Sequence, residues 1–223
     1  MHPLVVIAED DAEVRAILVE GLRDDGFAAE GVATAAALLE AVARRAPDVI
    51  VLDIGLPDGD GRDVCHALRA QGLHTPVLFL TALDALPDRI SSFRAGGDDY
   101  VSKPFALVEV AERLRALVRR GGGAGGRLEV SGLRLDPAAH AVQCRQATVR
   151  LTPTEFRLLA ALLAAPGAAV RRRTLKEAGW PHGALVHDNM LDAFVARVRR
   201  KLRQLPDAPS IRTLPGVGYS IET

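Results

Sequence analysis

Six side chains suited to phosphoryl transfer follow short apolar segments in the first half of the chain. They are Glu9, Asp10 and Asp11 after LVVIA, Asp53 at the end of VIVLD, Thr81 after PVLFL and Lys103 after DYVS. Clustered carboxylates repel one another unless a cation lies between them, and oxygen ligands suit Mg²⁺. A lysine supplies charge for a phosphate, and a threonine hydroxyl donates a hydrogen bond. Together these groups predict the transfer of a phosphoryl group to Asp53.

Bringing these residues together requires a parallel sheet. Apolar runs alternate with amphipathic segments through the first half; the runs start near Leu4, Ala28, Val49, Pro76 and Asp99, and the segments at Ala12, Ala35, Asp60, Leu86 and Ala106. This alternation predicts five βα units in an α/β, doubly wound sheet with a flavodoxin-like strand order. Because ligands of such sheets bind at the carboxyl ends of the strands, the six side chains are expected at one edge.

Each of these residues also has a simpler explanation. The acidic cluster after the first run could favour the dipole of the next helix, Asp53 and Thr81 could cap turns, and Lys103 could be solvated. Matched chemistry at four separate strand ends favours a functional site over four independent coincidences.

The formal net charge of zero combines two halves of opposite charge. Residues 1–120 hold 13 basic and 20 acidic side chains, whereas residues 121–223 hold 15 and 8. The glycine-rich stretch 121–126 lies between the halves and is expected to be a flexible linker. An acidic half suits cations or a basic partner surface, and a basic half suits a polyanion.

Composition narrows the class of protein. With 48% hydrophobic and 25% charged residues, the chain is typical of a globular protein. The sequence has no signal-peptide pattern and no apolar run of about 18 residues, so we expect a cytoplasmic protein without a membrane span. Cys65 and Cys144 match no metal or redox spacing and are expected to be free thiols.

The second half, residues 127–223, predicts a winged helix-turn-helix domain. Short strand-like segments come first. A helix then begins with Thr152 as N-cap, Pro153 at its first position and Glu155 completing a capping box. A shorter helix over RRTLKEAGW and a long one over DNMLDAFVARVRRKLRQL follow, and the glycine-turned hairpin IRTLPGVGYSIET comes last.

The motifs of both halves resemble those of one protein family. In the first half, EDD, LDIGLPDGDG, LTA and DDYVSKPF resemble, in order and separation, the receiver domain of bacterial two-component response regulators. In the second half, LTPTEFRLLAAL, ARVRRKLR and GVGY are similar to the effector domain of the OmpR/PhoB winged-helix subfamily. The resemblance covers essentially the whole chain. It implies a phosphorylation-controlled transcriptional regulator, with a sensor histidine kinase, promoter DNA, RNA polymerase and a second copy as partners.

The resemblance also implies a role for each residue of the receiver site. Asp53 matches the phosphoacceptor, Glu9 and Asp10 match the acidic pair that binds Mg²⁺, and Gly55 matches the position that adds a backbone carbonyl ligand. The resemblance also implies that the chain catalyses only its own phosphorylation and dephosphorylation, so we do not expect a conventional enzyme.

Thr81 and Lys103 match the residues that contact the phosphoryl group, and Tyr100 matches the switch aromatic that turns inward with Thr81. Spacing alone would make Tyr100 a half-buried strand residue. The resemblance places a dimer face on the fourth helix, the fifth strand and the fifth helix, with cross-subunit ion pairs from Arg89, Asp98, Asp99, Glu109, Arg113 and Arg120. Spacing alone would make these a solvated surface, where each pair contributes about 0–1 kcal/mol.

The long helix of the second half predicts a DNA-reading surface. Its apolar stripe comprises Met190, Leu191, Phe194, Val195, Val198 and Leu202. Arg197, Arg200 and Lys201 are placed largely on other faces, where arginine can reach guanine edges and lysine can neutralise phosphate. Without the basic half and the family resemblance, such a face would indicate only a solvated surface.

Other basic residues are expected to support DNA binding. Arg171, Arg172 and Arg173 predict phosphate contacts, and the hairpin contributes Arg212 and Tyr219. The family usually has an arginine before the G-x-G-Y turn and often a basic residue after its tyrosine, but here Pro215 and Ser220 occupy those positions. Because proline carries no cation, we expect weak reading of a narrow minor groove, with Arg212 as the substitute.

Two other readings of the sequence compete with a phosphorylated regulator. A haloacid-dehalogenase-like phosphatase also uses a strand-end Asp, Thr, Lys and Mg²⁺, but its DxD motif needs a second Asp where this chain has Gly55. A DNA-binding protein with a silent receiver is the third reading, and the complete set of acidic, Lys and Thr residues argues against it.

Overall fold

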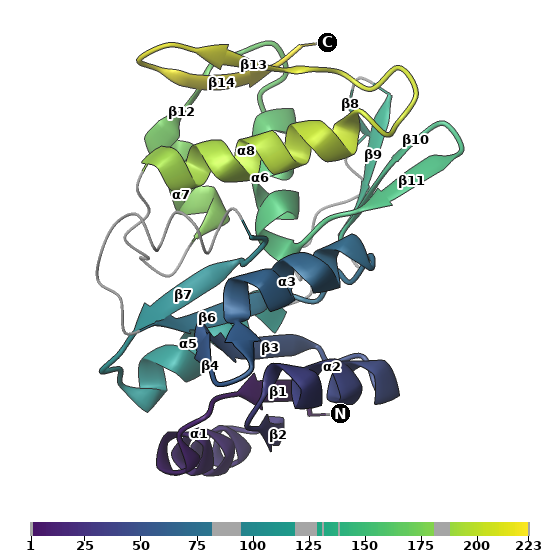
Figure 1. Ribbon diagram of the computed structural model, residues 1–223. Coiled ribbons are helices and arrows are strands. Elements are labelled where there is room, and N and C mark those ends of the chain that lie inside the picture. Colours follow the sequence, from purple (N-terminus) through teal and green to yellow (C-terminus); the bar gives the residue numbers. More distant parts are fainter. Residues whose placement is uncertain are drawn as a thin grey trace. The chain divides into compact units, whose positions relative to one another are not determined.

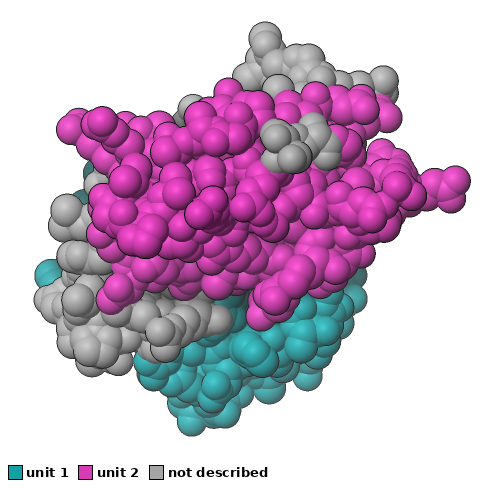
Figure 2. Space-filling model, turned by 90° about the horizontal axis from the view of Figure 1, so that it is seen from above, with its two compact units in different colours: residues 1–118 teal, residues 119–223 magenta. Residues whose placement is uncertain are grey.

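The chain folds into two compact units, residues 1–118 and 119–223 (Figure 2). The computed structural model describes residues 2–81, 95–118, 129–130, 132–137, 139–180 and 188–222. Most of the helix expected from Leu86, and the linker expected at 121–126, lie outside the described residues.

Unit 1 is built on a five-stranded parallel sheet (Figure 1). Its strands are β1 (Leu4–Ala8), β2 (Ala28–Val32), β3 (Val49–Asp53), β6 (Val77–Thr81) and β7 (Asp99–Ser102). The spatial order is β2-β1-β3-β6-β7, so the flavodoxin-like prediction is confirmed. Every residue of β1, β3 and β6 is buried, as expected of strands covered on both faces.

Four described helices belong to unit 1: α1 (Ala12–Asp24), α2 (Ala35–Arg44), α3 (Gly61–Ala70) and α5 (Leu107–Val118). Side chains of Asp11, Thr34 and Asp60 accept backbone N–H bonds at the starts of α1, α2 and α3. Leu18 and Leu22 of α1 and Leu114 of α5 pack with the sheet in one apolar cluster. These helices therefore hold the strand ends in fixed positions.

A small antiparallel hairpin follows β3. It consists of β4 (Gly55–Leu56) and β5 (Gly59–Asp60), joined through Pro57 and Asp58. The Gly61 amide donates to the Ile54 carbonyl at 2.9 Å and returns the chain to the end of β3. A Cβ atom at Gly61 would lie 2.2 Å from the Asp53 carbonyl oxygen, so this close approach requires glycine.

Unit 2 begins with a four-stranded antiparallel sheet in the order β11-β10-β9-β8. Its strands are β8 (Glu129–Val130), β9 (Leu133–Asp136), β10 (Ala141–Cys144) and β11 (Ala147–Arg150). The rest of the unit comprises α6 (Pro153–Leu163), β12 (Val170–Arg171), α7 (Arg172–Gly179), α8 (Asp188–Leu202), β13 (Ile211–Leu214) and β14 (Gly218–Ile221). The last three strands pair as β12-β14-β13 and form the wing (Figure 1). The winged helix-turn-helix prediction is confirmed.

The core of unit 2 joins its three helices. Trp180 packs edge-on against Phe194 of α8, with ring centroids 4.9 Å apart. Leu158 and Leu159 of α6 are fully buried. The predicted capping box at Thr152 and Glu155 is present. Cys65 and Cys144 form no disulfide bond, as predicted, and both are buried. No described helix is long and apolar enough to cross a membrane.

Candidate functional site

Three carboxylates meet at the carboxyl edge of the parallel sheet in unit 1. Glu9 and Asp10 directly follow β1, and Asp53 is the last residue of β3. Each offers an oxygen atom, and these atoms lie within 4.8 Å of one another. Glu9 and Asp53 are buried, whereas Asp10 is exposed. The site is therefore formed on the adjacent central strands β1 and β3 and opens toward Asp10.

Lys103, which follows β7, bridges two of these carboxylates. Its Nζ lies 2.5 Å from Asp53 Oδ2 and 2.8 Å from the Glu9 carboxylate. Burial raises the pKa of Glu9, and the Lys103 hydrogen bond offsets part of that rise. Burial alone would lower the pKa of Lys103, but the bonds to Asp53 and Glu9 outweigh it and the pKa is raised. The Lys103 cation thus offsets part of the negative charge of the acidic group in this structure.

The donor atoms of the site fit a hard divalent cation. Glu9, Asp10 and Asp53 supply only oxygen ligands, and the partial exposure of the group leaves room for water. This combination suits Mg²⁺, which keeps several waters and uses few protein carboxylates. Gly55, the further expected ligand, is exposed, and its amide donates to Asp53 Oδ1 at 3.1 Å.

The backbone of the acidic pair is held by Arg15 of α1. Its Nη1 donates to the carbonyl oxygens of Glu9 and Asp10, at 2.6 and 3.0 Å. Asp11 instead caps α1, because its Oδ1 accepts from the amides of Glu13 and Val14. These backbone bonds lower the pKa of Asp11. Asp11, the third carboxylate of the EDD motif, thus caps α1. This agrees with the simpler explanation that the acidic cluster favours the start of the next helix.

Thr81 and Tyr100 lie on the two strands beyond Asp53. Thr81 ends β6 and is 2% exposed, and its carbonyl accepts the Lys103 amide at 2.7 Å. Tyr100 lies in β7, and its side chain is buried in this structure. The buried position is deeper than the half-buried one that spacing alone predicted. The structure therefore brings Asp53, Thr81 and Lys103 to one sheet edge.

Asp98, a residue of the predicted dimer face, is buried within unit 1. Its side chain is fully buried, and Oδ2 accepts from Arg69 Nη2 at 2.9 Å and from the Val77 amide at 3.1 Å. The solvated position that spacing alone predicted for Asp98 is wrong, because this carboxylate is out of water and uses internal donors. Its role in dimerisation stays a prediction. Arg89 and Arg120 lie outside the described residues.

The other charged residues of this face pair within unit 1. Arg113 of α5 donates to Asp99 at 3.0 Å and to Glu109 at 2.7 Å. Burial alone would lower the pKa of Arg113, but Asp99 and Glu109 raise it. Arg113 is 15% exposed and Glu109 is 45% exposed at the side chain, so the network reaches the surface through Glu109.

In unit 2, the prediction that Arg197 lies on an exposed face of α8 is wrong. Its side chain is 9% exposed, its Nε lies 3.6 Å from Glu155 Oε1, and its guanidinium carbon lies 3.7 Å from the centre of the Phe194 ring. Lys201 donates to Glu155 Oε2 at 2.6 Å and is also largely buried. Both cations face α6 rather than solvent, because the buried Glu155 carboxylate requires counter-charge.

Arg200 is the exposed member of the predicted basic set on α8. On the wing side, Arg171 and Arg212 are exposed, whereas Ser220 and Tyr219 are buried. Arg173 is also exposed and pairs with Glu177 at 2.8 Å. Among the described residues, the exposed cations of the predicted DNA-binding set thus lie on α8, β12, the start of α7 and β13.

Arg172 joins three elements of unit 2 and is not a free phosphate ligand. Its guanidinium donates to the Asp188 carbonyl and pairs with the carboxylate of Asp192, both on α8. The Tyr219 hydroxyl of β14 also donates to Asp192 Oδ1, at 2.5 Å. Burial would lower the pKa of Arg172, but Asp192 and Tyr219 raise it. Asp192 of α8 therefore connects this helix to α7 through Arg172 and to the wing through Tyr219.

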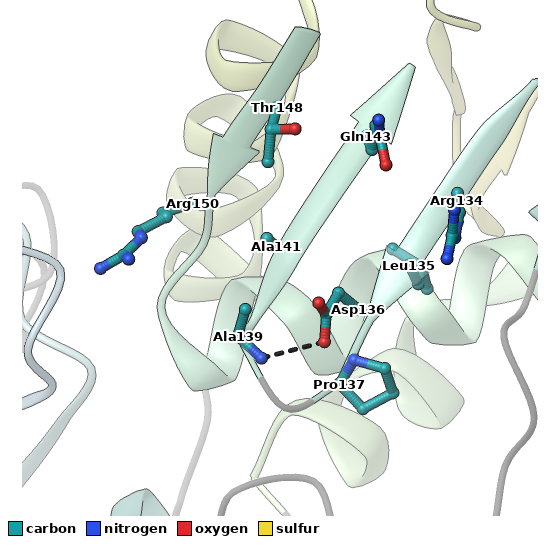
Figure 3. A pocket seen from close by; sticks show the side chains of 9 residues that line it. All are labelled: Arg134, Leu135, Asp136, Pro137, Ala139, Ala141, Gln143, Thr148 and Arg150. Carbon is teal, nitrogen blue, oxygen red and sulfur yellow. Dashed lines mark hydrogen bonds between the residues drawn. The ribbon is translucent and has the colours of Figure 1, made fainter. Parts of the chain in front are cut away.

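Sequence reasoning did not single out Arg15, Arg69 or Asp192. Each contacts its partner across an element boundary, so no local motif marks it. A hollow on the four-stranded sheet of unit 2 was also unforeseen (Figure 3). It is lined by Arg134, Gln143, Thr148 and Arg150, among others, and Asp136 is its only acidic lining residue. This set offers mainly hydrogen-bond donors and shows no catalytic arrangement.

Both units match known domain families. Residues 5–115 match the response regulator receiver domain, and residues 146–221 match the C-terminal domain of transcriptional regulatory proteins. The chain belongs to the OmpR/PhoB-type response regulators of two-component systems, which combine a receiver with a DNA-binding domain. This family assignment decides against the phosphatase reading. It implies a kinase and DNA as partners.

Relatives align over nearly the full chain. The probable transcriptional regulatory protein TcrX of Mycobacterium tuberculosis is 38% identical over 226 residues, which is 99% of this chain and 96% of TcrX. The response regulator protein PmrA of Pseudomonas aeruginosa is 41% identical over 220 residues, 98% of this chain and 97% of PmrA. The solved structure of DrrB, an OmpR/PhoB homologue from Thermotoga maritima, covers 100% of both chains with a TM-score of 0.53 and 28% identity.

Proposed function

We propose that Asp53 accepts a phosphoryl group from a sensor histidine kinase in a Mg²⁺-dependent reaction. Residues 1–120 form the receiver, 121–126 the linker and 127–223 the effector, which binds promoter DNA where RNA polymerase acts. Phosphorylation promotes dimerisation of receivers. The observation that carries this proposal is the meeting of Glu9, Asp10 and Asp53 beside Lys103 at one sheet edge.

The chain's own residues supply the transfer step. An Asp53 oxygen attacks phosphorus, a new O–P bond forms, and the N–P bond to the kinase histidine breaks. Glu9, Asp10, Asp53 and the Gly55 carbonyl would hold the cation, which would supply positive charge for the phosphoryl oxygens. Lys103 already contacts Asp53 and donates to the same oxygens, while the Thr81 hydroxyl hydrogen-bonds to the phosphoryl group.

Phosphorylation then acts through the strands next to Asp53. The modification adds nearly two negative charges at neutral pH, and Thr81 and Tyr100 lie on β6 and β7, which pair directly. A change at this edge reaches Asp99 and Arg113, because Asp99 begins β7 and binds Arg113. We infer that this network changes partners when two receivers meet, so Arg113→Ala leaves the phosphoryl adduct intact but prevents dimerisation.

The first experiment combines mass spectrometry with light scattering on the full chain. Acetyl phosphate with Mg²⁺ is expected to add one phosphoryl group, to convert monomer to dimer and to tighten binding to DNA selected from random duplexes. Asp53→Asn is the matched control, because it keeps the shape of the side chain and removes the nucleophile. An adduct that persists in Asp53→Asn refutes the assignment. The absence of any adduct in the unaltered chain supports the silent-receiver reading.

DNA contact is tested at Arg200. Because its side chain is exposed on α8, Arg200→Ala is expected to weaken binding and to reduce the salt dependence by about one phosphate contact. Lys201→Ala provides the contrast. Its side chain binds Glu155, so its loss acts through domain stability and leaves the salt slope unchanged. An unchanged salt slope for Arg200→Ala would contradict the proposed interface.

A further inference from the structure

Asp58 lies at the tip of the hairpin that follows the phosphoacceptor strand, yet its side chain reaches another element. Its Oδ1 accepts from the Ala35 amide at 2.8 Å, and its Oδ2 accepts from the Ala36 amide at 3.0 Å. Both amides belong to the first turn of α2, which is 22–23 residues earlier in the chain. The hairpin tip is thus bound to the start of a helix in a two-point contact.

This contact completes the N-terminus of α2. The first amides of a helix have no partner within the helix. Thr34, the N-cap, accepts only from the Ala37 amide, at 3.1 Å. Asp58 accepts from the two amides that remain before it, and its charge favours the positive end of the helix. These bonds lower the pKa of Asp58, so the side chain is ionised and bidentate at neutral pH.

The same hairpin carries Gly55 on its first strand. Gly55 pairs with Asp60 and Leu56 pairs with Gly59, so Asp58 lies in the turn between the two strands. At its base the hairpin is held by Asp60, which caps α3, and by the Gly55 amide bound to Asp53. The base is thereby attached to α3 and to Asp53. The described contact that ties the tip to another element is that of Asp58.

We propose that Asp58 is a positioning residue for the cation site. By anchoring the hairpin tip to α2, it fixes the position of the Gly55 backbone relative to the carboxylates of Glu9 and Asp53. This inference rests on the proposed function, in which that carbonyl is a cation ligand. Groups that orient a metal ligand affect affinity without touching the metal. A cation site in unit 1 therefore depends on α2, which contributes no ligand of its own.

The test measures Mg²⁺ binding to the full unphosphorylated chain by titration calorimetry. Asp58→Ala is expected to raise the dissociation constant about tenfold, the lower end for loss of an orienting group. At saturating Mg²⁺ its phosphorylation by acetyl phosphate should recover, because Asp53, Thr81 and Lys103 are intact. Asp58→Asn keeps one acceptor oxygen in place of two. Its Mg²⁺ dissociation constant should therefore lie between those of the unaltered chain and Asp58→Ala.

Thr34→Ala is the matched control. It removes an acceptor from the same turn of α2 but does not touch the hairpin, so it should lower the melting temperature and leave Mg²⁺ affinity unchanged. Equal Mg²⁺ affinity in Asp58→Ala and the unaltered chain overturns the proposal, as does an equal loss of affinity in Thr34→Ala. If the unaltered chain itself binds no Mg²⁺, the proposed function fails and this inference fails with it.

Discussion

Removing the charge of Glu155 should destabilise unit 2 more than most single substitutions. The residue is 1% exposed, and Oε2 accepts from Lys201 Nζ at 2.6 Å and from the Thr152 amide at 2.9 Å. The other carboxylate oxygen, Oε1, lies 3.6 Å from Arg197 Nε. Glu155→Gln keeps the shape of the side chain and an acceptor for Thr152, but it leaves both cations without their counter-charge.

The size of the effect follows from burial. The side chains of Arg197 and Lys201 are only 9% and 13% exposed, so water cannot replace the lost carboxylate fully. Breaking a buried ion pair by removing one partner costs about 3–5 kcal/mol, a large part of the roughly 5–15 kcal/mol that stabilises a domain. With a urea dependence of about 1.5 kcal/mol per molar, the unfolding midpoint should fall by roughly 2–3 M.

Trp180 provides the assay. It is the only tryptophan in the chain, belongs to unit 2 and packs on Phe194 of α8, so its fluorescence in urea reports this unit alone. Thr152→Ala is the matched control, because it removes the other half of the capping box and keeps the charge. Loss of an N-cap costs about 1 kcal/mol, so its midpoint should fall much less.

The pH dependence gives an independent check. Burial would raise the pKa of Glu155, but Arg197 and Lys201 outweigh it, and the pKa in the folded chain lies below its ordinary value of 4.5. The stabilisation from its charge is therefore complete above pH 4.5 and is lost as the pH falls through the depressed pKa. Glu155→Gln should lack this change. A loss below about 1 kcal/mol for Glu155→Gln at pH 7, where a buried pair predicts several, would refute the reasoning.

Three further predictions concern the two sites. Lys103→Met should lower the melting temperature without Mg²⁺, because Glu9 and Asp53 lose their shared cation, and Mg²⁺ should then raise the melting temperature more than in the unaltered chain; equal shifts would contradict this. Asp192→Ala should weaken binding to selected DNA about tenfold by releasing Arg172 and Tyr219, whereas Arg145→Ala, which removes an exposed ion pair with Asp207, should have no effect. Because Pro215 occupies the wing tip, binding-site selection should show little preference for A·T tracts there; a strong preference that survives Arg212→Ala would disprove this.

The sheet and the acidic site could be predicted because their signals are local. Each strand of the sheet is a short apolar run, and Glu9, Asp53 and Thr81 lie at or directly beyond the ends of such runs. Parallel order then brings these ends to one edge without any knowledge of packing. The capping box was equally local, since Thr152 and Glu155 are three residues apart.

Arg197 shows where the prediction failed and which signal was overlooked. Met190, Phe194, Arg197 and Lys201 follow helical spacing and share one face of α8, so two cations extend the apolar stripe. Treating every arginine as solvent-facing ignored this spacing. Their partner, Glu155, is 42 residues earlier than Arg197, and its burial could not be read from α8 alone. The burial of Asp98 was missed for the same reason, because its partner Arg69 lies 29 residues away in the sequence.

The three glycines that follow β3 differ in the space around them, which determines which substitutions each position can accept. Cβ atoms at Gly55 and Gly59 would meet nothing within 4 Å, and neither residue has a positive φ angle. A Cβ at Gly61 would collide with the Asp53 carbonyl. In a library of all single substitutions, positions 55 and 59 should accept alanine and many larger residues without loss of folding, whereas position 61 should return only glycine. Sequences that diverge from this chain can therefore change the residue type at positions 55 and 59, whereas position 61 must stay glycine.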